Sequence, residues 1–258
     1  MHPLESMATR NLAVILAWTL AACQPATAGP TPAPPADPPG KLPPASALPP
    51  AQRFERDMML RFHMLSSFDA ARTIERLLIR GRLDEARYFA QAMATEPDVP
   101  GMAPWAAPIA RVRERAAAIA TAPDLAEACR REARLADACA SCHRDAGAQA
   151  EFQPPHDVPP DLPTVVARMA RHRWAADRLR EGMIGEADDA WRAGLDILAA
   201  APIAPLASLG ADRKELARRL QQLADQARHA DGPPADRVRV YGEILVTCAA
   251  CHGGAPRG

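Results

Sequence analysis

The strongest chemical signal in this sequence is a short cysteine and histidine motif that occurs twice. The two copies are Cys139-Ala-Ser-Cys142-His143 and Cys248-Ala-Ala-Cys251-His252. In a helix, residues i, i+3 and i+4 share a face, so the two thiols and the imidazole of each copy can meet one flat group. The C-x-x-C-H pattern is typical of c-type haem attachment, in which the thiols form thioethers with the porphyrin vinyl groups. The imidazole then points at the iron. The sequence therefore predicts two covalently attached haems, held by all six of these cysteines and histidines.

Two other chemistries use the same residue types. A redox-active C-x-x-C pair stands at a helix N-terminus within a βαβ pattern, whereas both motifs here fall at the C-terminal ends of helical segments. A zinc site built jointly from both motifs is the second alternative. Cys129 belongs to neither motif. We expect it to be a small core residue on a helix, with a redox or pairing role as the alternative.

The N-terminal segment has the features of an export signal. An apolar run of about 12 residues follows Arg10; it is too short to span a bilayer but has the length of a signal-peptide core. The run ends in Leu20-Ala21-Ala22-Cys23, which resembles the bacterial lipobox. The resemblance implies cleavage before Cys23 and a diacylglycerol on its thiol, and an ordinary secretory signal is the alternative. Residues 1–22 are therefore expected to be a lipoprotein signal peptide, beginning at either Met1 or Met7.

A proline-rich segment follows the expected lipidation site. Between Gln24 and Pro50 there are 11 prolines in 27 residues. This composition cannot bury enough apolar surface to fold, and proline favours an extended polyproline II conformation. At about 3.1 Å per residue the segment could reach on the order of 80 Å. Residues 23–50 are therefore predicted to be a lipidated cysteine and a spacer.

The remainder of the chain contains an internal repeat. Met64-Leu-Ser-Ser-Phe-Asp-Ala-Ala71 aligns with Met169-Ala-Arg-His-Arg-Trp-Ala-Ala176 at an offset of 105 residues. With one residue of shift, Gly81-Arg-Leu-Asp-Glu-Ala86 aligns with Gly185-Glu-Ala-Asp-Asp-Ala190, and the two motifs lie 109 residues apart. This pattern indicates a tandem duplication.

Each copy has the sequence pattern of four helices. In the first copy we expect helices from Ala51 to Gly81, Leu83 to Thr95, Trp105 to Ala120, and from a capping box at Thr121-Ala-Pro-Asp124 to near Cys142. In the second copy, apolar residues recur at helical spacing at Leu216, Leu220, Leu223 and Ala227, and along Val238, Tyr241, Leu245, Cys248 and His252. The latter spacing places Cys248 and His252 on a core-facing stripe.

No segment alternates apolar and polar residues with period two, so no sheet is expected. The predicted fold is all-α, with two tandem four-helix-bundle-like haem domains at residues 51–153 and 154–258. Each would carry its motif at the C-terminal end of its last helix.

A C-x-x-C-H motif near the C-terminus of a four-helix unit resembles the class II c-type cytochromes, the cytochrome c-prime group. In class I cytochromes the motif lies near the N-terminus. The resemblance covers residues 51–258, twice over. It implies His143 and His252 as proximal iron ligands, and a first helix that supplies either an apolar residue or a methionine ligand on the distal face. The chain departs from the family in its tandem form and its expected lipid anchor.

The distal ligands remain open at this point. Met64 and Met169 occupy equivalent positions on the first helix of each copy, which suits a shared role as distal iron ligands. Methionine at an apolar helix position is also a common core filler. His172 shares a face with Met169 and is an alternative ligand, but its counterpart is Ser67. His63 is the remaining candidate in the first copy.

These features favour an electron carrier that passes single electrons between periplasmic or membrane redox proteins, rather than an enzyme. The alternative is a c-prime-like protein whose open distal sites bind NO or CO, and a peroxidase-like activity is a third possibility. Lys and Arg number 31, as do Asp and Glu, so the net charge is zero and nucleic acid is not an expected partner. The expected location is the periplasmic side of a bacterial membrane, reached through the lipid anchor, with inner or outer membrane left open.

Overall fold

The computed structural model describes residues 49–98, 102, 105–148, 150, 152, 157–200, 210–228 and 234–253. The expected signal peptide, the lipidation site at Cys23 and nearly all of the spacer lie outside the described residues. Within those residues, no helix is both long enough and apolar enough to cross a membrane.

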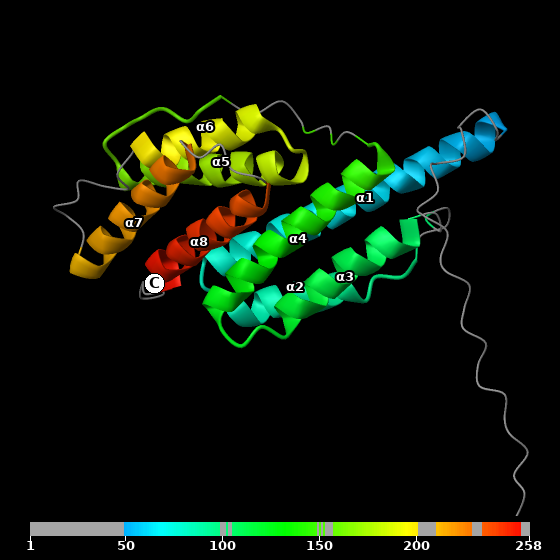
Figure 1. The fold of residues 1–258 in the computed structure, drawn as a ribbon, viewed down its shortest axis with the longest axis horizontal. Helices are drawn as coiled ribbons and strands as arrows, with labels where there is room; N and C mark the ends of the chain where they lie inside the picture. Colours follow the sequence, from blue (N-terminus) through cyan, green and yellow to red (C-terminus); the bar gives the residue numbers. More distant parts are fainter. Residues whose placement is uncertain are drawn as a thin grey trace, which may run out of the picture. The chain divides into compact units, whose positions relative to one another are not determined.

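The described residues form eight α-helices and contain no strand, which confirms the all-α prediction for this part of the chain (Figure 1). The helices are α1 (Pro50–Ile79), α2 (Leu83–Ala94), α3 (Ala106–Ala120), α4 (Leu125–Ala146), α5 (Val165–Ile184), α6 (Asp188–Ala200), α7 (Ala211–Arg228) and α8 (Pro234–Gly253). The first motif lies in the last two turns of α4 and the second in the last two turns of α8.

Helix α4 differs from the sequence prediction at both ends. Its N-cap is Asp124, whose side chain accepts a hydrogen bond from the Glu127 backbone N–H at 2.8 Å, whereas Thr121 instead ends α3. The sequence predicted a capping box from Thr121 to Asp124. In the structure Asp124 alone caps α4, and Glu127 is at the third helical position. At the other end, α4 continues past Cys142 to Ala146 and stops at Gly147, which has a left-handed φ of 61°.

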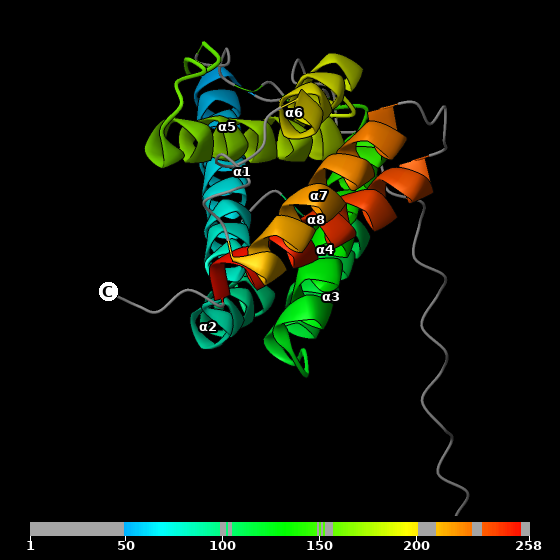
Figure 2. The ribbon, with the colours of Figure 1, turned by 90° about the vertical axis from the view of Figure 1, so that its left-hand side faces the viewer.

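The two motif-bearing helices pack along each other. Helices α4 and α8 lie side by side, with α1, α2 and α3 around α4 and with α6 and α7 beyond α8 (Figures 1 and 2). Gly242 on α8 permits this close approach, since a Cβ there would lie 3.4 Å from the Arg130 Cα and 3.5 Å from the Ala133 Cβ. Ala133 and Gly242 are equivalent positions at the 109-residue motif offset. Small residues therefore face each other where the two copies meet.

Buried charges join the first helices of the two copies. Helices α1 and α5 cross in the view of Figure 2, and Glu75 on α1 forms an ion pair with Arg180 on α5; both residues are 1% exposed. Next to it, Arg72 donates to both carboxylate oxygens of Asp177, at 3.3 and 3.2 Å. In both pairs the partners are 105 residues apart, the offset of the repeat. Each charged residue therefore pairs with the residue at the equivalent position of the other copy.

This pairing is available to a duplicated chain and not to a symmetric dimer. At a two-fold axis each residue meets its own copy, so a charge on the axis faces an identical charge. In one chain the two repeat-related positions can differ, and the sequence has Glu75 and Arg180 at one such pair of positions and Arg72 and Asp177 at another. The opposite signs favour association of the two halves of one chain.

A continuous apolar core supports this arrangement. Residues from both copies belong to one buried cluster, including Ile74 on α1, Leu135 on α4, Leu195 on α6 and Ile244 on α8. All the described residues belong to one compact unit. The division at residues 51–153 and 154–258 therefore remains a prediction from the repeat alone.

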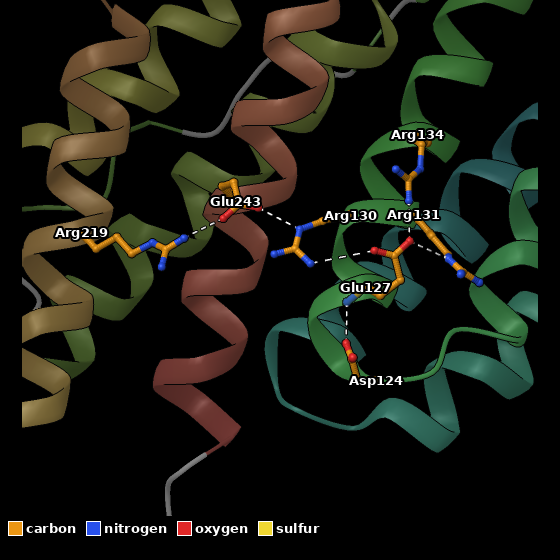
Figure 3. A network of polar contacts seen from close by, with 7 residues as sticks. All are labelled: Asp124, Glu127, Arg130, Arg131, Arg134, Arg219 and Glu243. Atoms are coloured by element: carbon orange, nitrogen blue, oxygen red, sulfur yellow. Dashed lines mark hydrogen bonds and ion pairs between the residues drawn. The ribbon is translucent and has the colours of Figure 1, made fainter.

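A chain of partly exposed ion pairs connects α4, α8 and α7 at the surface (Figure 3). Glu243 on α8 accepts from Arg130 on α4 at 2.9 Å and from Arg219 on α7 at 2.7 Å. Along α4, Glu127 accepts from Arg131 at 2.9 Å and from Arg134 at 2.7 Å. Exposed pairs of this kind contribute roughly 0–1 kcal/mol each.

The buried pair gives a stability prediction. Arg180→Leu leaves the Glu75 carboxylate buried without its partner, and the free energy of unfolding should fall by roughly 3–5 kcal/mol, measured by urea denaturation. The double variant Glu75→Leu with Arg180→Leu should recover part of the loss because no unpaired charge remains. As a control, Arg192→Leu removes an exposed arginine of α6 and should change stability little. Equal effects of Arg180→Leu and Arg192→Leu would contradict the role given to this pair.

Candidate functional site

The first motif lies on α4 beside the turn between α5 and α6. Cys139, Cys142 and His143 are half-buried. A cavity of about 290 Å³ adjoins His143 and Ile184, and its remaining lining is mostly small, with Ala140, Gly147, Ala148, Ala150 and Gly185 among it. Nδ1 of His143 is buried and has no hydrogen-bond partner among the described residues. The imidazole thus stands next to open space with one ring nitrogen unused.

The second motif has a matching position against the first copy. Gly253, directly after His252, lies so close to Gly81 that a Cβ on Gly81 would be 2.9 Å from the Gly253 Cα. Gly81 is in the turn between α1 and α2, and Gly185 is its equivalent in the turn between α5 and α6. Each motif therefore ends against the turn that connects the first two helices of the other copy, so both copies contribute to each site.

The degree of burial differs between the motifs and corrects one expectation. On α8, Tyr241 and Leu245 are buried and Cys248 is half-buried, as the helical stripe predicts. His252 is exposed, because it lies at the very end of the helix. The stripe therefore faces the core only as far as Cys248.

The electrostatics of both histidines favour the neutral imidazole. Burial lowers the pKa of His143, and a backbone hydrogen bond with Ile184 opposes this effect. His252 is exposed as a residue, but its ring is partly desolvated at the end of α8, which lowers its pKa, and the nearby positive charges of Arg213 and Arg80 lower the pKa further. A neutral imidazole has a lone pair for a metal, so both histidines are suited to bind iron near neutral pH.

The thiols do not have the properties of a redox-active C-x-x-C pair. All five cysteines in the described part of the chain are free. Burial raises the pKa of Cys139 and of Cys248 to about 12. A disulfide-exchange cysteine requires the opposite shift, since the thiolate is the nucleophile. Cys129 is fully buried on α4, as expected for a small core residue.

A bare metal site has no support in the described ranges. They contain no group of three or more His, Cys, Asp or Glu side chains placed to hold a metal ion. The zinc alternative, in which the two motifs share one ion, therefore gains nothing from the geometry. Each motif instead offers two free thiols and an imidazole on one helical face, and this set of donors fits a covalently attached haem.

The candidate distal ligands are less clearly placed. Met64 on α1 is 40% exposed, and Met169 and His172 on α5 are half-buried. His63 is buried, with its Nδ1 3.7 Å from Glu96 Oε1. None of these four residues lines the cavity at His143. Their role as distal ligands remains a prediction.

The sequence analysis placed Tyr241 on the core-facing stripe but did not consider its hydroxyl, and it missed the buried carboxyl of Glu132. Glu132 on α4 and Tyr241 on α8 are equivalent at the 109-residue offset, and both are fully buried. Tyr241 donates to Glu75 Oε1 at 2.8 Å. The signal was present in the sequence: Glu132 precedes Cys139 and His143 at the helical spacing by which Tyr241 precedes Cys248 and His252.

Comparison of the chain with protein-family models, with curated proteins and with solved structures finds no match.

The close contact at the second motif gives a matched pair of variants. Gly81 and Gly147 both have a left-handed φ, of 71° and 61°, so alanine at either should cost about 1–2 kcal/mol in backbone strain. Only at Gly81 does the added Cβ also strike backbone, at Gly253, because nothing lies within 4 Å of it at Gly147. Gly81→Ala should therefore lower the melting temperature, followed by circular dichroism, clearly more than Gly147→Ala. Equal losses would show that the end of α8 does not rest on this turn.

Proposed function

We propose that this chain is an exported dihaem c-type cytochrome that passes single electrons between redox partners. The observation that carries the proposal is the pair of C-x-x-C-H motifs, each with free thiols, in the last turns of two helices that pack along each other. Two motifs on adjoining helices of one compact unit suit transfer through the protein as well as to and from it.

In this proposal the protein holds and tunes the cofactors. Haem c supplies the one-electron iron chemistry, and axial ligation, burial and hydrogen bonding set its potential. Cys139 and Cys142 would attach the first haem, and Cys248 and Cys251 the second. His143 and His252 would be the proximal ligands, kept neutral by the surroundings described above.

The partners are proposed to be other periplasmic or membrane redox proteins. A lipid on Cys23 would hold the protein at the membrane, and the spacer to Pro50 would let it move between partners within a reach on the order of 80 Å. Inner and outer membrane remain alternatives for the anchor.

One observation favours a second candidate function, the binding of NO or CO at an open distal site. Met64 is 40% exposed, so its thioether is not fixed in the core at a defined distance from the motif. If neither methionine binds iron, the distal faces stay open to small ligands.

The main prediction is two covalently bound haems. The intact mass of the purified exported protein, after heat and acid extraction of loose haem, should exceed that of the polypeptide by two haem masses. His252→Ala should disturb only the second haem, and Cys142→Ala should remove one thioether of the first. Loss of all haem on extraction would refute the proposal.

The two candidate functions separate at the distal ligands. If methionine ligates iron, Met169→Ala should convert one haem to a high-spin form that binds CO and leave the other unchanged, as seen in the visible spectrum. His172→Ala is the matched variant one helical turn away. A spectral change in His172→Ala alone would assign the ligand to histidine. High-spin, CO-binding haems in the parent protein would favour the ligand-binding function.

A further inference from the structure

Three charged side chains are buried to 1% exposure, and one of them lacks a counter-charge. These are Glu75, Glu132 and Arg180. Glu75 is paired with Arg180 and also accepts from the Tyr241 hydroxyl. Glu132 has no ion pair in the described part of the chain, and its Oε2 is buried without a hydrogen-bond partner there. An unpaired carboxylate in such a place is strongly disfavoured, so the carboxyl tends to hold a proton.

Among the described residues, no arginine of the surrounding helices forms an ion pair with Glu132. Helix α8 presents Tyr241, and Arg180, the fully buried arginine of α5, is paired with Glu75. From α1 and α5, Arg72 and Asp177 pair with each other, with half-buried Arg76 beside Asp177. The buried residues of α3 are all uncharged, and on α4 itself the neighbouring titratable groups are Cys129 and Cys139. Burial accordingly raises the pKa of Glu132 to about 8.

Glu132 also lies close to the first motif. It precedes Cys139 by seven residues, and Glu132, Ala136, Cys139 and His143 follow one another at spacings of four, three and four, which is one helical face. The carboxyl acts electrostatically on the Cys139 thiol. A charge on Glu132 would therefore act on a haem attached at Cys139 from within the protein interior, where Coulomb interactions are stronger than in water.

We propose that Glu132 is a proton-binding site linked to the oxidation state of the haem at Cys139 and Cys142. When the iron takes one electron from a donor and passes from the ferric to the ferrous state, the Glu132 carboxylate takes one proton from solvent and becomes a carboxylic acid. On oxidation the electron and the proton leave again. The net charge of this buried region is therefore the same in the two oxidation states. The inference rests on the proposed function, because it requires a haem at the first motif.

The sign of the pH effect follows from this linkage. Added negative charge on the iron raises the pKa of Glu132 further, so proton uptake accompanies reduction at pH values near and above the pKa in the oxidised state. The midpoint potential of the first haem should then fall as pH rises through this range. Its steepest slope is a tenfold change in the redox equilibrium per pH unit, or 59 mV for one electron. The second haem should respond less, since its motif carries Tyr241 at the equivalent position.

The test is a spectroelectrochemical titration of the purified dihaem protein between pH 5 and pH 10. In the parent protein the midpoint potential of one of the two haems should fall as the pH rises. In Glu132→Gln, whose side chain keeps the shape but cannot ionise, this dependence of the potential on pH should vanish. Glu114→Gln, at an exposed position on α3, is the control and should keep the slope. A pH-independent parent, or an unchanged slope in Glu132→Gln, overturns the proposal.

A second measurement does not depend on any variant folding. The infrared difference spectrum of the parent, reduced minus oxidised at pH 8, should show a carboxylic-acid C=O band that shifts when glutamate is labelled with ¹³C. Absence of such a band also overturns the proposal. Failure of the proposed function would look different, because no covalent haem would then be found by mass.

Discussion

The ion pair between Glu75 and Arg180 is a fully buried charge contact that constrains how the two halves of this chain meet. Removing two charges from water is costly, and the cost is offset only when their partners are held in good geometry. Here the partners come from α1 and α5, the first helices of the two copies, so the pair is satisfied only when those helices cross at one place. The half-buried pair of Arg72 and Asp177 repeats the constraint one turn away. Together with the packing of α4 along α8, these pairs constrain how the two copies meet.

The two motifs lie on helices that pack directly against each other, α4 and α8. Each motif ends against the turn between the first two helices of the other copy, at Gly185 and Gly81. The charged side chains buried to 1% exposure are two acids, Glu75 and Glu132, and one base, Arg180. Glu132 is the buried acid that is not paired with a base, and it lies on the same helical face as Cys139 and His143. One buried acid is thus left unpaired on the helical face of the first motif, where the second motif has Tyr241 at the equivalent position.

The sequence predicted the helices well because helix formation is governed by local spacing and capping. Their bounds in the first copy were correct to within a few residues, and α4 differed because Asp124 is a stronger cap than Thr121 in this context and because the helix runs on to Gly147. The contacts between copies were not predicted, since they depend on long-range packing. Their signal was nevertheless present: the alignment that matched Met64 with Met169 also sets Glu75 opposite Arg180. Opposite charges at equivalent repeat positions were not considered as a contact.

The chemistry of the two motifs is tested most directly by metal analysis of the purified exported protein, combined with its absorption spectrum in the oxidised and reduced states. Two C-x-x-C-H sites predict two irons per chain and the spectrum of haem whose vinyl groups are saturated by thioether bonds. Zinc in place of iron, or an exported protein that contains neither iron nor haem absorbance, would contradict this account.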